Sequence, residues 1–164
     1  MIISYEHLPL IRSKAGSEPI YLKAGTFDMF HEGHRDILEF VQSLGGVSVI
    51  GISPDSRVQA RKGPSRPIRT QDQRAQDVEA SGIADFVFIV PDGLLGLPRS
   101  IRRLRPYAFV EHRDDSIGVG LVEPLLRLVG ARYVISEIPR VCSTTDIIAG
   151  KATSTLVNAN SYAS

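Results

Sequence analysis

Residues 20–34 read Ile20-Tyr21-Leu22-Lys23-Ala24-Gly25-Thr26-Phe27-Asp28-Met29-Phe30-His31-Glu32-Gly33-His34, and this stretch decides the fold. A short apolar run at 20–24 leads through a glycine-containing turn into a helical pattern at 33–44. An apolar strand that passes through a turn into a helix is typical of the first unit of an α/β domain.

The same alternation continues along the 164 residues. Apolar runs predict strands at 20–24, 47–52, 86–90, 107–111 and 132–136. Helical patterns lie between them, at 33–44, 71–81, 98–103 and 119–129, and a last helix opens near Thr144. We therefore expect a Rossmann-like, doubly wound α/β fold with a mostly parallel five-stranded sheet and helices on both faces.

Three segments are expected along the chain. An N-terminal extension, 1–19, is interrupted by Lys14, Gly16, Ser17 and Pro19 and should pack on the domain surface without a long element. The α/β domain follows at 20–152, and a small, polar tail at 153–164 should fray. Within the last long helix, a set of apolar residues recurs at helical spacing and should face the sheet. This set is Leu121, Val122, Leu125, Leu126 and Val129.

Composition excludes several classes of protein. Apolar residues make up 43% and charged residues 23%, as in ordinary globular domains. With 19 basic and 18 acidic residues, no global field attracts nucleic acid or an anionic membrane. A single cysteine, Cys142, excludes an intrachain disulfide. No stretch approaches the roughly 18 apolar residues of a spanning helix, and the first ten residues do not resemble a signal peptide, so we expect a soluble cytoplasmic protein.

Two histidines, His31 and His34, lie at the predicted start of the first helix. Backbone N–H groups are unpaired in the first turn of a helix and favour anions. A spacing of three places both rings on one face, and Gly25 and Gly33 remove side chains where a phosphate could approach closely. Two other interpretations stay open: a metal site with nearby carboxylates, although H-E-G-H is not the H-E-x-x-H spacing of zinc proteases, and a purely structural role.

The segment from Gly25 to His34 resembles the GTFDxxHxGH motif of the cytidylyltransferase-like nucleotidyltransferases. Three further segments are similar to that family in order and approximate distance. They are Ile52-Ser53-Pro54-Asp55 after the second strand, Lys62-Gly63 with Arg74 further on, and the closing Cys142-Ser143-Thr144-Thr145-Asp146-Ile147-Ile148. The resemblance covers about residues 20–150, so the domain at 20–152 is expected to be a nucleotidyltransferase domain.

The resemblance implies roles for these residues. His31 and His34 would contact the triphosphate and stabilise the transition state, and Lys62 would reach the phosphates as the third catalytic residue. The implied nucleotide-binding residues are Gly25, Thr26, Phe27, Gly33, His112, Asp114, Asp115, Arg140, Ser143, Thr144 and Thr145. Two plainer interpretations stay open, because Lys62 lies in a basic, polar run that is typical of solvated loops and because Ser143, Thr144 and Thr145 are also typical of a helix N-cap.

The expected reaction is an in-line attack by a phosphate or phosphonate oxygen on the α-phosphorus of a nucleoside triphosphate, with release of pyrophosphate. Such a nucleophile is already ionised at neutral pH, so no general base is required. Catalysis then depends on positioning and charge neutralisation. We expect Mg²⁺ to accompany the triphosphate, held mostly by phosphate oxygens and water, and no protein metal site.

The nucleotide is indicated by the stretch after the fourth strand. Glu111-His112-Arg113-Asp114-Asp115 is similar to the His-Gly-Asp-Asp stretch of choline- and ethanolamine-phosphate cytidylyltransferases, whereas adenylyl-transferring relatives more often have Lys-Gly-Gly-Asp. CTP is therefore expected. Arg113 departs from the glycine of that pattern, the segment at 139–142 is shorter than in the family, and Asp114 and Asp115 are also consistent with a polar turn.

The acceptor is a small phosphorylated or phosphonate compound, for which Asp28, Asp55 and Arg74 are the expected contacts. Asp55 and Arg57 are equally consistent with exposed loop residues. Three alternative functions stay open: an adenylyltransferase that uses ATP on a sugar phosphate, flavin mononucleotide or phosphopantetheine; a catalytically inactive nucleotide-binding module; and a structural protein. Family relatives commonly form homodimers, so a homodimer is expected.

Overall fold

The computed structural model of the chain describes residues 1–113, 119–139 and 144–150, and within them five strands form one sheet. The strands are β1 (Ile20–Gly25), β2 (Val47–Ile52), β3 (Phe86–Ile89), β4 (Ala108–His112) and β5 (Arg132–Ser136). Their order is β3-β2-β1-β4-β5, and every pair is parallel. The predicted Rossmann-like α/β fold is confirmed, with an all-parallel rather than a mostly parallel sheet.

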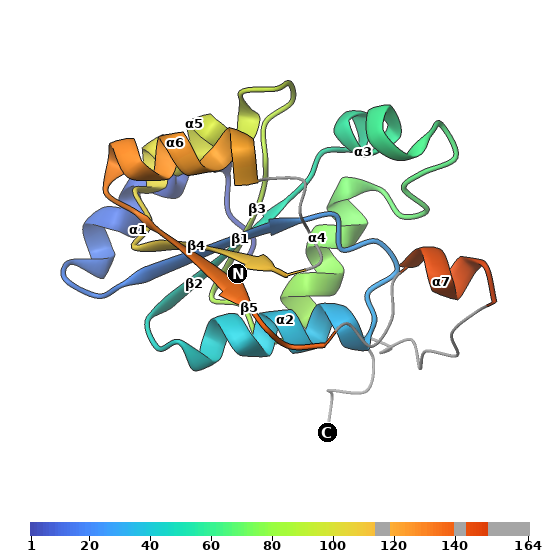
Figure 1. The fold of residues 1–164 in the computed structure, drawn as a ribbon, viewed down its shortest axis with the longest axis horizontal. Helices are drawn as coiled ribbons and strands as arrows, with labels where there is room; N and C mark the ends of the chain where they lie inside the picture. The colour runs from blue at the N-terminus through green and yellow to red at the C-terminus, as the bar shows by residue number, and fades with distance from the viewer. Residues whose placement is uncertain (114–118, 140–143, 151–164) are drawn as a thin grey trace.

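Helices cover both faces of this sheet (Figure 1). One face carries α1 (Leu8–Ala15), α5 (Gly96–Leu104) and α6 (Val119–Val129), and the other carries α2 (Glu32–Ser43) and α4 (Gln71–Ala80). Two further helices, α3 (Asp55–Lys62) and α7 (Thr144–Ile148), stand outside these layers on the side toward which β1 points (Figure 1). No helix in the described part of the chain is both long and apolar enough to cross a membrane.

The core has two halves, one on each face of the sheet. Ile20 and Leu22 of β1 contribute to the half beneath α1, α5 and α6, and Tyr21 contributes to the half beneath α2 and α4. Because both faces are covered, the strands are apolar at nearly every position. The predicted inward face of α6 is confirmed at Val122, Leu125, Leu126 and Val129; the side chain of Leu121 lies outside the described residues.

The N-terminal segment contains a short helix that the sequence did not predict, and this helix ends at Ala15, before Gly16. A 3-10 turn, η1 (Tyr5–His7), leads into α1, whose Leu8 and Ile11 are buried in the core with α5. Ile2 forms a parallel bridge with Val87 of β3, on an edge of the sheet. The helix has eight residues and two buried positions, so it is too short to display a helical period in the sequence.

A second unpredicted helix, α3, lies in the long polar connection between β2 and α4. It begins after Pro54 and ends at Lys62, and its C-cap residue, Gly63, has a φ of 95° that suits glycine. Val58 is its one buried residue, so no apolar stripe indicated a helix in the sequence. The connection from 53 to 70 is therefore a helix and a loop instead of a loop alone.

We predict that Leu8→Ala lowers the free energy of unfolding by about 2–5 kcal/mol, because it leaves a cavity under α1. Urea unfolding followed by circular dichroism measures this change. The matched control is Leu10→Ala in the same helix, where Leu10 is 56% exposed. Equal losses in the two variants would show that α1 does not belong to the core.

Candidate active site

The loop after β1 lies at the point where the strand order reverses. From β1 the chain moves outward through β2 to β3, and then returns to place β4 on the other side of β1. The carboxyl ends of β1 and β4 therefore lie at the switch point of the strand order, which is where open α/β sheets bind ligands. In this loop, Phe27 and Met29 have φ values of 53° and 50°. Such left-handed backbone is unfavourable for bulky residues and concentrates at functional sites.

The ring of Phe27 occupies the space beside Gly25, the last residue of β1, where a side chain would otherwise lie. A Cβ atom built on Gly25 would lie 2.8 Å from the nearest carbon of that ring. Phe27 is itself 2% exposed, and its ring centroid lies 5.2 Å from that of His34. A side chain at position 25 would therefore displace the phenyl ring beside His34; the predicted approach of a phosphate to Gly25 stays a prediction.

The two histidines lie face to face at the start of α2. His31 is the N-cap residue of α2 and is 2% exposed, and His34 lies in the first turn. The ring centroids are 3.8 Å apart with an angle of 21° between the planes. The expectation that both rings share one face of the helix is confirmed. Gly33, between them, is half-buried in the same turn.

The closing segment of the chain meets this loop through Thr144, the first residue of α7. The hydroxyl of Thr144 donates to the carbonyl oxygen of Asp28 at 2.8 Å, and its Oγ1 lies 3.4 Å from Nε2 of His31. Thr144 is buried and Thr145, which follows it, is exposed. Two segments more than 110 residues apart in the sequence are thus joined beside the histidines.

The end of α3 also lies beside the loop after β1. Nη2 of Arg61 donates to Oγ1 of Thr26 at 3.0 Å. Lys62, the next residue and the last of α3, is exposed. The structure thus places the predicted lysine on a helix that is anchored to the loop after β1.

Asp28, a predicted acceptor contact, has protein partners on both carboxylate oxygens. Oδ2 accepts from Nη2 of Arg66 at 2.9 Å, from Nε of Arg66 at 3.2 Å and from the amide of Ile68 at 3.0 Å. Oδ1 accepts from the amide of Arg69 at 3.0 Å. The side chain is 1% exposed. Asp28 therefore fastens residues 66–69 to the loop after β1.

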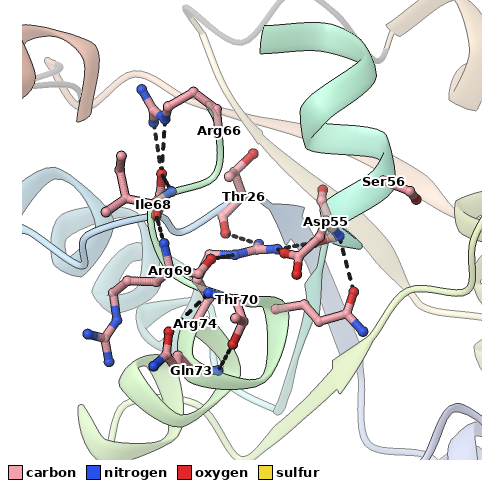
Figure 2. Close-up of polar contacts among 12 residues, drawn as sticks. Thr26, Asp55, Ser56, Arg66, Ile68, Arg69, Thr70, Gln73 and Arg74 are labelled. Carbon is pink, nitrogen blue, oxygen red and sulfur yellow. Dashed lines mark hydrogen bonds and ion pairs between the residues drawn. The ribbon is translucent and has the colours of Figure 1, made fainter. Parts of the chain in front are cut away.

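Arg74, a second predicted acceptor contact, is fully buried in α4. Its guanidinium donates to the carbonyl oxygens of Thr26, Ser53 and Arg69 and to the carboxylate of Asp55, the third predicted contact. Figure 2 shows Arg74 extended among Thr26, Arg69 and Asp55. One side chain thus connects the loops that follow β1 and β2 with the start of α4.

The structure describes some of the nucleotide-binding residues that were predicted after β4. His112, the last residue of β4, is 7% exposed at the carboxyl edge of the sheet. Arg113 forms an ion pair with Glu137 at 3.0 Å, and its amide donates to the carbonyl of Ser136. The other predicted residues here and in the closing segment, Asp114, Asp115, Arg140 and Ser143, lie outside the described residues.

A buried ion pair at this edge was not predicted from the sequence. Lys23 of β1 and Glu111 of β4 are 3% and 7% exposed, and their side chains form an ion pair between the two strands at the switch point. The sequence did contain a sign of this pair, because a lysine buried within the apolar run 20–24 requires a partner of opposite charge. The partner is 88 residues away, so the sequence alone could not identify it.

Comparison with known proteins agrees with this geometry. The profile of a family described as cytidylyltransferase-like matches residues 22–150. The chain belongs to the cytidylyltransferase-like family. Within it, the chain is 30% identical over 155 residues to the bifunctional protein HldE of Campylobacter concisus, and 32% identical over 143 residues to HldE of Magnetococcus marinus. These matches cover 94% and 85% of this chain but 29% and 28% of the relatives, so the chain spans less than a third of their length.

Solved structures share the fold of this family member at low sequence identity. A lipopolysaccharide core biosynthesis protein from Thermoplasma volcanium matches with a TM-score of 0.63 and 19% identity, over 77% of this chain and all of that one. A pantoate-beta-alanine ligase from Francisella tularensis, complexed with beta-gamma ATP and beta-alanine, matches with a TM-score of 0.63 and 15% identity, over 92% of this chain and 76% of that one. Both likenesses concern the fold.

We predict that Gly25→Ala lowers the free energy of unfolding by about 1–3 kcal/mol, because the added methyl group overpacks against the ring of Phe27. Thermal unfolding measures the loss. Phe27→Leu removes the ring. In that background, Gly25→Ala should lower the free energy of unfolding by less than it does in the wild-type protein. An unchanged melting temperature in Gly25→Ala would show that the ring does not occupy this space.

The acidic residues of α2 predict a pH dependence of stability. Burial, followed by repulsion from Glu32 and Glu39, raises the pKa of Asp36 above its ordinary value of 3.8, against the attraction of Arg35. The folded state therefore binds this proton more tightly than the unfolded state, and stability falls as pH rises from about 3.8 through the folded pKa.

We therefore predict that Asp36→Asn raises the melting temperature at pH 7 and that this gain disappears below the ordinary pKa of the carboxyl group. Thermal scans from pH 3 to pH 8 measure the difference. The control is Asp72→Asn, at the first turn of α4, which removes a carboxylate from a favourable position and should give no gain. A gain that is independent of pH would contradict the electrostatic explanation.

Proposed function

We propose that the chain is a nucleotidyltransferase that transfers a nucleoside monophosphate from a nucleoside triphosphate to a small phosphorylated or phosphonate acceptor and releases pyrophosphate. The observation that carries the proposal is the meeting of His31, His34 and Thr144 at the start of α2. Imidazoles, a hydroxyl and the amino end of a helix together form a site for an anion. Membership of the cytidylyltransferase-like family supports the same class of reaction.

The chemistry assigned to these residues is positioning and charge neutralisation. An acceptor phosphate oxygen attacks the α-phosphorus in line with the leaving pyrophosphate, and it needs no general base because it is already ionised. His31 and His34 donate to phosphate oxygens as charge develops, and Lys62 neutralises the leaving group. Thr144 and Thr145, with the N-terminal amides of α7, are proposed contacts of the β- and γ-phosphates.

Mg²⁺ is proposed to enter with the triphosphate. The donors around the loop after β1 are imidazoles and hydroxyls, and both oxygens of the loop carboxylate, Asp28, already accept protein N–H groups. In the described part of the chain, no group of three or more His, Cys, Asp and Glu side chains could hold a metal ion. This donor set fits a metal held by phosphate oxygens and water, which would neutralise charge on the leaving pyrophosphate.

CTP is the first nucleotide candidate, supported by the similarity of His112-Arg113-Asp114-Asp115 to the cytidylyltransferase stretch. ATP is the second, since Arg113 replaces the glycine of that stretch and forms an ion pair with Glu137. The shared fold with a ligase solved with beta-gamma ATP is compatible with ATP as well. Sugar phosphates belong in the acceptor panel, because a protein of lipopolysaccharide core biosynthesis shares the fold. A homodimer and a cytoplasmic location remain predictions.

We predict pyrophosphate release from either CTP or ATP in the presence of Mg²⁺ and one acceptor class. The panel contains sugar 1-phosphates, glycerol 3-phosphate, ethanolamine phosphate, flavin mononucleotide, phosphopantetheine and a phosphonate. His31→Ala and His34→Ala should each lower kcat by about 100-fold or more, since each removes a donor to the transition state. His7→Ala, which changes an exposed histidine of η1, is the matched control and should keep full activity.

Two outcomes would contradict this proposal. Tight nucleotide binding by calorimetry without pyrophosphate release from any acceptor would favour a nucleotide-binding module that has lost turnover. Turnover that persists at the wild-type rate in both histidine variants would place the chemistry elsewhere.

A further inference from the structure

Residues 55–70 form an arm beside the sheet, made of α3 and the loop that leads to α4. Only Val58 of α3 is buried, so apolar packing contributes little to the position of this helix. Figure 1 shows α3 standing apart from the two helical layers. The arm carries Lys62, to which the proposed function assigns a role at the leaving phosphates. Its position must therefore be set by polar contacts.

Asp28 holds the far end of the arm. Its carboxylate, 1% exposed, accepts four hydrogen bonds from three residues of the arm, Arg66, Ile68 and Arg69. Two of these donors are backbone amides, so the contact fixes the path of the main chain and not only a side chain. Asp28 itself lies between Phe27 and Met29, and both of these residues have left-handed backbone. The loop that carries the Asp28 side chain is therefore conformationally constrained.

Arg74 holds the near end of the arm. Nη2 donates to Oδ1 of Asp55 and to the carbonyl of Ser53, both at 2.7 Å, where the arm begins. Nη1 donates to the carbonyl of Thr26 in the loop after β1, and Nε donates to the carbonyl of Arg69 at 3.0 Å. Figure 2 shows this side chain between Thr26 and Asp55. Both ends of the arm are thus tied to the loop that leads to the histidines.

Little hydrogen-bonding capacity remains on either group for a substrate. A carboxylate has about four acceptor positions and a guanidinium five donors; Asp28 accepts four bonds from the protein, and Arg74 donates four. Arg74 is also fully buried. Buried charged groups whose hydrogen bonds are all made fix the relative positions of their partners, whereas their net effect on the free energy of unfolding is often small.

We propose that Asp28 and Arg74 are positioning residues that fix the arm to the loop after β1 and thereby set where Lys62 meets the triphosphate, in place of the acceptor contacts expected from the sequence. The proposal rests on the proposed function for the role of Lys62. The attachment of the arm by these two side chains does not depend on it.

A double-mutant cycle tests the functional half. Asp28→Asn and Lys62→Ala should each lower kcat/KM by about tenfold or more, as expected for lost bonds to charged groups. If Asp28 acts through Lys62, the double variant should equal Lys62→Ala within about twofold. Losses that multiply would overturn the proposal. So would a kcat that is unchanged while the KM for the acceptor rises, since that pattern indicates direct acceptor binding.

Hydrogen exchange measured by mass spectrometry tests the structural half without any turnover. Asp28→Asn should speed exchange in peptides from 66–70, because asparagine keeps one acceptor oxygen and the Ile68 and Arg69 amides use two, while α2 and α5 keep wild-type protection. Arg66→Gln, which changes the partner on the arm, should act in the same direction and guards against a folding defect in Asp28→Asn. Unchanged exchange in both folded variants would overturn the proposal.

Asp85→Asn is the matched control. Asp85 accepts from the amide and the hydroxyl of Ser48 at 2.8 Å and 2.7 Å, at the amino-terminal edge of the sheet. It should keep wild-type kcat/KM and wild-type exchange in the arm, and a loss of activity equal to that of Asp28→Asn would overturn the positioning role. If the wild-type protein releases no pyrophosphate from any nucleotide, the proposed function fails, and the exchange result still decides whether the arm is held as described.

Discussion

Strand β1 is hydrogen-bonded on both edges and covered on both faces, and this constraint governs the rest of the structure. Its residues pair with β2 from Ile20↔Val47 onward and with β4 from Tyr21↔Ala108. Ile20 and Leu22 are fully buried. A strand enclosed in this way cannot shift along its axis without breaking two ladders and exposing its side chains. The end of β1 at Gly25 is therefore fixed in position, and the loop that follows starts from a rigid support.

Polar contacts then connect the separate segments of the chain that meet around that loop. Thr144 brings the closing segment to Asp28 and His31, Arg61 brings the end of α3 to Thr26, and Arg74 joins the loops that follow β1 and β2. Buried polar groups of this kind are unfavourable unless all of their partners are present. A site made in this way is therefore specific in geometry, because any displacement leaves a buried group without its partner.

The differences between expectation and structure have physical causes. α1 and α3 each have eight residues and at most two buried positions, so neither produces a helical period that the sequence could display. The sequence did not indicate that Phe27, two residues later, packs where a side chain of residue 25 would lie. The ion pair between Lys23 and Glu111 depends on two strands that are adjacent in space but not in sequence.

By itself, the sequence determined the order of strands and helices, the parallel α/β class and the histidine pair at the start of α2, because these follow from periodicity and from local spacing along one element. Tertiary structure decided which charged residues meet. Asp28 and Arg74 lie in segments that resemble the motifs of the family, and this resemblance indicated contact with a ligand. Their partners in the protein lie about 20 to 50 residues away along the chain. Whether a buried charge binds a substrate or another part of the protein depends on which groups surround it, and only the folded chain brings those groups together.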